Sequence, residues 1–576
     1  MLRYFIFSQD KFTLILELSM PLFVIAMLIF HKSILDSDKR QVCWRLLCLM
    51  PLALCAIHFG LRHFAGYMKL TWNLYGMFYV AAVIIAFWQF FAKGAVTYRI
   101  SAVVTVALVT VLCLYNTVMP ALSNPVVGNH SKDNYVESFI GITEDMERNY
   151  CLNEWKEIDY EFLTDTLLPE VEKAEMEQDE AGYLVALCKY AYYFHDSHVY
   201  ARAFKNIDSE TVVNDVKDRL AGNDYGFSMI TYTSGETVAV LVDRESEAYA
   251  FGIHDGTRIV SWDGIPIDEA KEGVECIYYG SEVHSIQENE DKLKAAFLAG
   301  KGGNEIEVEY VDENGNIQAT RLQKIGSYRN RLDDFIRRFY YYQLDKENFV
   351  VEMLSDTHGY LRIDSESYNT LLDVKAAFCD EHPELTSMLD EKLTSLKEQG
   401  MQTLIIDTRN NSGGYNVISA AVASMFTDIG GFNYSFGDYK DGSYILTEKH
   451  YYTGDGRWKD LNIIVLTNAA CMSAGDQLVN LLSQCPNVTV VGTTCSSGVN
   501  QNNGGVCVGT NTQFVVAYPF ALTLSEEGVP HIDVDKGREN RVPIDAYIPI
   551  DDEYIETVFG EDPIDYELEY ILEHYG

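Results

Sequence analysis

Four long apolar runs lie in the first 121 residues, and they constrain the chain more than any other feature. They span Phe12–Phe30, Cys43–Gly60, Trp72–Phe91 and Ile100–Ala121. Each has about the 20 residues that a helix needs to cross about 30 Å of hydrocarbon. A buried core helix would explain one such run but not four in succession, and no small-residue cleavage site of a signal peptide follows the first run. The sequence therefore predicts four transmembrane helices in residues 1–121.

Charge divides the chain into two unlike parts. Residues 1–120 hold ten Lys/Arg and four Asp/Glu, whereas the whole chain holds 44 and 84. The positive-inside rule places the first and third loops in the cytoplasm, because most of the basic residues lie in or beside them. We therefore expect an integral protein of the cell membrane whose acidic domain is extracytoplasmic. Because an acidic surface repels phosphate, nucleic acid is excluded as a partner.

The part that follows the apolar runs divides into a linker and three units. A short polar stretch with Pro125 reads as a linker, residues 122–134. Apolar residues at three- and four-residue spacing then predict a helical unit over 135–221. Short β-rich runs between Gly/Asp turns predict a β-rich module over 222–325. Alternating strand-like and helical runs predict an α/β core over 326–576.

Eight cysteines lie outside the apolar runs, without any C-x-x-C pair, so a zinc site has little support. Cys495 and Cys507 flank a loop rich in Gly and Asn, and they read equally well as a disulfide of an extracellular domain or as two thiols.

The β-rich module contains Gly252-Ile-His-Asp-Gly-Thr-Arg-Ile-Val-Ser-Trp-Asp-Gly264. This stretch resembles the pattern of PDZ domains, although Thr257 stands where that family usually has Asp. Such modules bind an extended peptide by strand addition and hold its C-terminal carboxylate in a backbone nest. The resemblance implies a peptide-binding edge formed by Tyr225, Gly226, Phe227 and Ser228. The alternative is a β-rich spacer that binds nothing.

The α/β part carries two motifs at strand ends. The first, Leu404-Ile-Ile-Asp-Thr-Arg-Asn-Asn-Ser-Gly-Gly-Tyr415, takes a buried strand through a polar turn into a glycine pair. Glycines there let backbone N–H groups face a cavity, which suits a developing oxyanion. In the second, Leu466–Leu482, a strand delivers Ser473 to the start of a helix, where the positive helix end favours a nucleophile. An ordinary N-cap serine has the same pattern.

Together, D-T-R-N-N-S-G-G-Y and N-A-x-x-x-S-A-G-D resemble the motifs of the tail-specific (C-terminal processing) peptidases. The order of helical unit, PDZ-like module and α/β core is also that family's order. The resemblance implies a crotonase-like α/β peptidase core that works without metal or cofactor. It also implies Ser473 as the nucleophile, with the backbone N–H groups of Gly413, Gly414 and Ala474 as oxyanion donors.

The general base departs from the usual pattern of that family. Its bacterial members use a lysine about 25 residues after the serine, but no Lys or Arg occurs between Ser473 and Lys536. A tricorn-like branch uses Ser–His–Glu instead, which implies His198 as base and Glu539 as the acid that orients it. The competing candidates are His195 and His531 for the base, and Glu526, Glu527, Asp533 and Asp535 for the acid.

The sequence as a whole predicts an α/β fold: a crotonase-like peptidase core with a helical N-terminal unit and a PDZ-like module, preceded by a four-helix transmembrane region. The predicted function is that of a membrane-anchored serine endopeptidase that cleaves extracytoplasmic polypeptides by acyl transfer. A catalytically inactive peptide-binding or signalling scaffold of the same fold is one alternative. An acyl-CoA enzyme that shares the core fold is the other, and it predicts an adenine-nucleotide site. The oligomeric state is left open.

Overall fold

The computed structural model describes residues 126–203, 209–279, 286–340, 349–368, 376, 379–512, 514–534, 539–540 and 542–575. This part divides into two compact units. The small unit contains the described residues of three segments: those up to Asp145, Ala203–Ser209 and Gly504–Val515. In it, β1 (Val126–Asn129) pairs in parallel with β18 (Asn502–Val508), followed by the short 3₁₀ turn Thr510–Thr512. The helix α7 (Tyr135–Asn149) begins in this unit.

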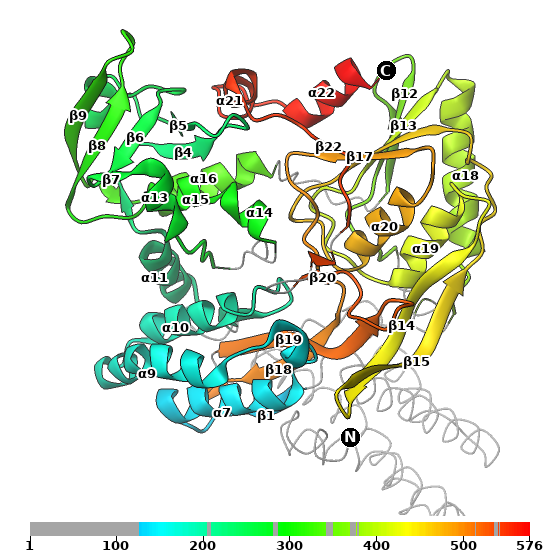
Figure 1. Ribbon diagram of the computed structural model, residues 1–576, viewed down its shortest axis with the longest axis horizontal. Coiled ribbons are helices and arrows are strands. Elements are labelled where there is room, and N and C mark those ends of the chain that lie inside the picture. The colour runs from blue at the N-terminus through cyan, green and yellow to red at the C-terminus, as the bar shows by residue number, and fades with distance from the viewer. Residues whose placement is uncertain are drawn as a thin grey trace, which may run out of the picture. The chain divides into compact units, whose positions relative to one another are not determined.

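The large unit begins with the predicted helices (Figure 1). They are α8 (Asn153–Lys156), α9 (Tyr160–Glu177), α10 (Glu180–Tyr192) and α11 (Ser209–Ala221), with the strand β2 (Tyr200–Ala203) before α11. The Asp159 and Asp179 side chains accept the N–H groups of Phe162 and Gly182. These N-caps fix where α9 and α10 start.

The β-rich module comes next in the chain, and it consists of short strands and short helices. Its strands are β3 (Asn223–Asp224), β4 (Ser228–Thr231), β5 (Thr237–Val240), β6 (Ile259–Trp262), β7 (Ile265–Pro266), β8 (Glu305–Val311), β9 (Ile317–Gln323) and β10 (Gly326–Ser327). Its helices are α12 (Glu247–Ala250), α13 (Ile267–Glu272), α14 (Gln287–Asp291) and α15 (Lys294–Leu298). The helix α16 (Arg329–Phe339) leads out of it.

The α/β part is built on one mixed sheet with the strand order β11-β12-β13-β16-β17-β22. The edge strand β11 (Val350–Met353) runs antiparallel to β12, and all the other pairs are parallel. The parallel strands are β12 (His358–Arg362), β13 (Thr403–Asp407), β16 (Asn462–Leu466), β17 (Val488–Gly492) and β22 (Ala546–Tyr547). The apolar runs Gly359–Ile363, Thr403–Ile406, Asn462–Leu466 and Val488–Val491 predict four strands, and β12, β13, β16 and β17 confirm them to within a residue.

Both faces of this sheet are buried, which explains its nearly continuous apolar strands. Leu404 and Ile406 of β13 pack in one cluster with the helices α18 (Pro383–Glu398), α19 (Asn416–Ser424) and α20 (Ala474–Ser483). Ile405 points to the other face, into a cluster that includes β-module residues, α16, α21 (Asp552–Val558) and α22 (Tyr566–His574). The sheet therefore has a layer of structure on each side, and the β-rich module packs in the second.

The remaining strands form a second sheet and a short ribbon. A long hairpin of β14 (Gly431–Lys440) and β15 (Ser443–Tyr452) pairs through β14 with β19 (Phe514–Leu524). The strand β20 (Asp533–Val534) pairs with β21 (Glu539–Asn540). The predicted domain boundaries at residues 134, 221 and 325 stay predictions.

The predicted transmembrane region needs a correction. Within the described ranges, no helix is both long enough and apolar enough to span a bilayer. The longest of them, α9, has 18 residues but carries charged side chains throughout, which hydrocarbon does not tolerate. The predicted four-helix transmembrane region is therefore not supported, and the fold is corrected to a peptidase-like α/β fold. The four predicted segments, residues 12–121, lie outside the described residues.

Candidate active site

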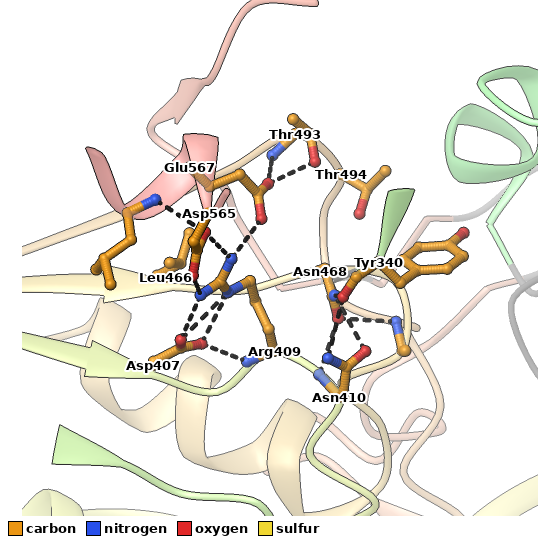
Figure 2. Close-up of polar contacts among 12 residues, drawn as sticks. Tyr340, Asp407, Arg409, Asn410, Leu466, Asn468, Thr493, Thr494, Asp565 and Glu567 are labelled. Carbon is orange, nitrogen blue, oxygen red and sulfur yellow. Dashed lines mark hydrogen bonds and ion pairs between the residues drawn. The ribbon is translucent and has the colours of Figure 1, made fainter. Parts of the chain in front are cut away.

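The two motif turns lie next to each other at the carboxyl edge of the central sheet. The strand β13 ends at Asp407 and β16 at Leu466, and these two residues are register partners in parallel strands. The turns are joined directly: Thr408 N–H donates to Leu466 O (2.8 Å), and Asn410 N–H donates to Asn468 Oδ1 (3.0 Å; Figure 2). Strand ends of this kind are where open α/β sheets place their ligands.

Ser473 stands at the junction of its turn and the helix α20. Its backbone has φ 61° and ψ −122°, a region that few L residues adopt and that is typical of functional sites. Its N–H donates to Val499 O at 2.8 Å. The Ser473 side chain makes no capping hydrogen bond to the helix and is half-buried. The geometry therefore differs from that of an N-cap serine, whose oxygen accepts a helix N–H.

The glycine turn lies directly against this serine. A Cβ added to Gly413 would be 2.5 Å from Ser473 Cβ and 3.1 Å from Ala474 N. The Gly413 N–H donates to Asn411 Oδ1 at 2.8 Å. Among the described residues, the N–H groups of Gly414 and Ala474 have no hydrogen-bond acceptor. Of the three predicted oxyanion donors, two are thus unengaged and one is occupied by Asn411.

Asp476, in the first turn of α20, anchors the loop that passes behind the serine. Its carboxylate accepts the N–H groups of Gly498 (3.0 Å) and Val499 (3.1 Å). Asp476 is fully buried, and burial raises its pKa to about 7. Because Val499 also accepts the Ser473 N–H, this loop and the serine form one unit.

His198 lies in the segment that borders the same loop. The neighbouring Ser197 Oγ is 2.6 Å from Ser497 Oγ, and Ser497 N–H donates to Cys471 O, two residues before the serine. The His198 backbone N–H donates to Asp196 Oδ1 at 2.8 Å. The ring is buried, and its Nδ1 has no partner within the described structure. Burial lowers the pKa of His198, and the Asp196 charge opposes that shift. No hydrogen bond joins His198 to Ser473 in the residues described.

The competing histidines occupy different surroundings. The His195 side chain is exposed, and its backbone φ is 42°. His531 is buried, with Nε2 2.6 Å from Gln477 Oε1, and burial lowers its pKa to about 4. His531 therefore reads as a neutral core histidine.

The candidate acids also differ in how deeply they are buried. Glu526 and Glu527 are exposed, and Asp535 lies outside the described residues. Asp533 is fully buried, forms an ion pair with Lys156 (3.2 Å) and pairs through its backbone with Val499. The backbone of Glu539 forms β21 opposite Val534, and its side chain lies outside the described part. Glu539 therefore lies on the strand next to β20, and Asp533 of β20 pairs with Val499.

The four predicted peptide-binding residues are all buried. Tyr225 and Phe227 pack in the apolar cluster that includes their own module, and Ser228 Oγ lies 2.5 Å from Tyr328 OH. Gly226 has φ 98° and donates its N–H to Asp224. The side chains at this edge thus belong to the module's own core, and among the described strands β4 pairs only with β5.

A buried ion cluster supports the first motif turn. The Arg409 guanidinium contacts Asp407 and Asp565, both at 2.6 Å, and Glu567 at 3.0 Å (Figure 2). Glu567 also accepts the N–H of Thr493 at 2.9 Å. The cluster therefore ties the ends of β13 and β17 to the start of α22.

Three residues with clear structural roles at the site, Asn411, Asp476 and Glu366, were assigned no role from the sequence. An acidic residue in the first turn of a helix often binds N–H groups near the helix N-terminus. Asp476 has this position in the sequence, so its role could have been predicted. Glu366 had no such signal, because Asp-Ser-Glu-Ser reads as a solvated loop. In the described residues, no group of three or more His, Cys, Asp or Glu is placed to hold a metal ion.

A strained serine at a helix start, beside two unengaged N–H groups and under a parallel sheet edge, is the arrangement of a serine-type hydrolase. The model of Peptidase family S41 matches residues 357–535, which include both motif turns. Over these residues the chain is similar to peptidase family S41, and this match supports a serine-type peptidase.

Several solved structures that are similar to this chain are proteases. The photosystem II D1 C-terminal processing protease is 17% identical, over 74% of this chain and 98% of that one, with a TM-score of 0.32. Mature CPAF complexed with lactacystin is 14% identical, over 77% and 99%, with a TM-score of 0.44. The tricorn protease is 15% identical, over 76% of this chain and 37% of that one, with a TM-score of 0.30. At these values the likenesses carry no argument about mechanism. No curated protein matched the chain significantly.

Proposed function

We propose that the chain is an endopeptidase that cleaves polypeptides by acyl transfer, with Ser473 as nucleophile, His198 as general base and Glu539 as the acid that orients the imidazole. The observation that carries the proposal is Ser473 itself: it is held at φ 61° beside the two unengaged N–H groups of Gly414 and Ala474. C-terminal processing of protein substrates is the activity that fits the family best. The extracytoplasmic location stays a prediction.

The chemical steps follow from these positions. Ser473 Oγ attacks the carbonyl carbon of the substrate, and His198 takes the hydroxyl proton. The oxygen of the tetrahedral intermediate accepts hydrogen bonds from Gly414 and Ala474, at the positive end of α20. The proton passes from His198 to the leaving amine. Water then hydrolyses the acyl-enzyme by the reverse sequence of proton transfers.

We further propose that the PDZ-like module binds the substrate through its backbone. The side chains of Tyr225, Phe227 and Ser228 are buried, so an added peptide strand would meet main-chain groups there. The support is that β4 has a strand partner on only one side within the described part of the chain, because an unpaired strand edge is a template for strand addition.

Labelling with a fluorophosphonate probe tests the nucleophile and the base together. In the full-length chain, we expect His198→Asn to abolish labelling at Ser473, because the hydroxyl then lacks a base. The matched control is His195→Asn, which makes the same change three residues away on an exposed side chain and should label as the wild type does. Because burial lowers the pKa of His198 from the usual histidine value, its imidazole stays neutral in mildly acidic solution, and labelling should decline only at lower pH than an ordinary histidine would give. Equal loss in both variants, or labelling of His198→Asn at the wild-type rate, would remove His198 as the base. A folded wild type that never labels would favour the inactive scaffold.

Gly413→Ala should lower kcat about 10²- to 10³-fold, the range observed when an oxyanion donor is lost. The added methyl group would lie 2.5 Å from Ser473 Cβ, so the serine must move away from Gly414 and Ala474. Gly315→Ala is the matched control, since Gly315 has the same φ of 79° and nothing within 4 Å of its added Cβ. Steady-state cleavage of casein by the two variants separates displacement of the serine from the common backbone strain. Equal kcat values would contradict the proposed site.

A further inference from the structure

The Asn411 side chain is the centre of the glycine turn. Its Nδ2 donates to Ile363 O (2.9 Å) and to Glu366 Oε1 (2.8 Å). Its Oδ1 accepts the Gly413 N–H, and its backbone carbonyl accepts the Met472 N–H at 3.0 Å. The two acceptors at Nδ2 fix which way the amide faces. Asn411 therefore joins the turn before the glycines to the turn before Ser473.

The backbone of Glu366 brackets the second glycine. Its N–H donates to Gly413 O and its carbonyl accepts the Tyr415 N–H, both at 3.1 Å. In a trans peptide the N–H points opposite to the carbonyl. Because Gly413 O faces Glu366, the Gly414 N–H of the same peptide group points away from Glu366. A Cβ on Gly414 would lie 2.5 Å from the Glu366 carbonyl carbon, so the contact requires glycine.

The Glu366 side chain is fully buried, and its Oε2 has no hydrogen-bond partner in the part described. Burial raises its pKa to about 8, and the Asp476 charge on α20 adds to the shift. The other titratable group that senses this carboxyl is the buried Cys471 thiol. At neutral pH, Glu366 is thus a neutral acid that accepts one hydrogen bond from Asn411.

We propose that Glu366 is a positioning residue for the oxyanion donors, holding the Asn411 amide through its side chain and the Gly413–Gly414 peptide group through its backbone. This inference rests on the proposed function and concerns the same site. With the Asn411 amide fixed, Gly413 stays engaged with it, and the Gly414 N–H stays directed at the acyl oxygen. A charge on Glu366 would be buried without a second partner, so ionisation loosens the turn.

The test compares Glu366→Gln and Glu366→Leu in the full-length chain, with the exposed Glu352→Leu on β11 as control. The probe is a fluorophosphonate, whose phosphoryl oxygen occupies the oxyanion position, and the readout is the labelling rate from pH 6 to 10. Wild-type labelling should fall above about pH 8, where Glu366 ionises, whereas Glu366→Gln should not show this fall. Glu366→Leu removes the acceptor for Asn411 and should label about ten- to a hundredfold more slowly at every pH.

A thermal unfolding series separates positioning from a structural role. The native state binds the Glu366 proton more tightly than the unfolded chain, so the wild type loses stability as the pH rises from about 4.5 to about 8. Glu366→Gln lacks this loss, and its unfolding midpoint should rise relative to the wild type across that window. Glu366→Leu leaves one Asn411 N–H without its acceptor, so its unfolding midpoint should lie below that of Glu366→Gln, but it too should lack the wild type's loss of stability between about pH 4.5 and 8.

The outcomes are distinct. Wild-type labelling rates in Glu366→Leu, or identical pH profiles for the wild type and Glu366→Gln, would overturn the inference and leave the proposed function standing. A folded wild type that does not label at any pH would overturn the proposed function, and the positioning role with it.

Discussion

Replacing Ser473 by alanine is expected to lower kcat by about 10⁴- to 10⁶-fold, the range for loss of a serine nucleophile. The residual rate would come from substrate binding and the oxyanion donors. The Ser473 oxygen makes no side-chain cap to α20, and its half-buried position needs no internal partner. The alanine variant should therefore unfold within a few degrees of the wild type. Steady-state casein cleavage and thermal unfolding of the full-length chain measure the two effects.

Ser473→Gly is the informative partner of this variant. It should be equally inactive, but more stable than Ser473→Ala by about 1 kcal/mol, because glycine adopts a φ of 61° without the Cβ penalty. Such a gain would mean that the fold gives up stability to present the serine. More than a tenth of wild-type activity in Ser473→Ala would exclude it as nucleophile. A glycine variant less stable than the alanine variant would contradict the strain.

Local signals in the sequence were sufficient for the sheet and the two turns. Strands such as Asn462–Leu466 are continuous apolar runs because both faces of the sheet are covered, and the Gly413–Gly414 pair and Ser473 follow strand ends directly. These features depend on neighbours within about a dozen residues. Prediction of the helix after the second motif succeeded for the same reason.

The rest depends on contacts between distant segments. Asn411 occupies the Gly413 N–H because Glu366, 45 residues earlier, orients its amide. The predicted peptide edge is buried because Ser228 meets Tyr328, 100 residues later. Neither contact produces a periodic pattern of residues from which it could be predicted. The base and acid were placed by resemblance alone, and the Glu539 side chain is not among the described groups that could test it.

Arg409→Met is expected to destabilise the protein by about 3–5 kcal/mol, the cost of removing one partner from a buried ion pair. Asp407, Asp565 and Glu567 all contact this guanidinium, and the Arg409 side chain is 2% exposed (Figure 2). Methionine fills a similar volume without charge, so three carboxylates would lose their only shared cation among the described residues. Chemical unfolding of the full-length chain, followed by circular dichroism, gives the change in the free energy of unfolding.

Two further variants assign this cost to the uncompensated charges. Arg409→Lys keeps the charge but cannot contact three carboxylates with a planar fork, so its loss should be smaller but measurable. Adding Asp565→Asn and Glu567→Gln to Arg409→Met should recover much of the stability, because two of the three carboxylates that lost the cation are then neutral and Asp407 alone remains. The deficit of Arg409→Met should also shrink as the pH falls. Burial already raises the pKa of Glu567, so protonation relieves the repulsion first at that carboxyl.

An equal deficit at pH 5 and pH 8, with no recovery in the triple variant, would show that the arginine acts through packing. In that case the link between the strand ends and α22 would be apolar, and the glycine turn would keep its geometry without the ion cluster.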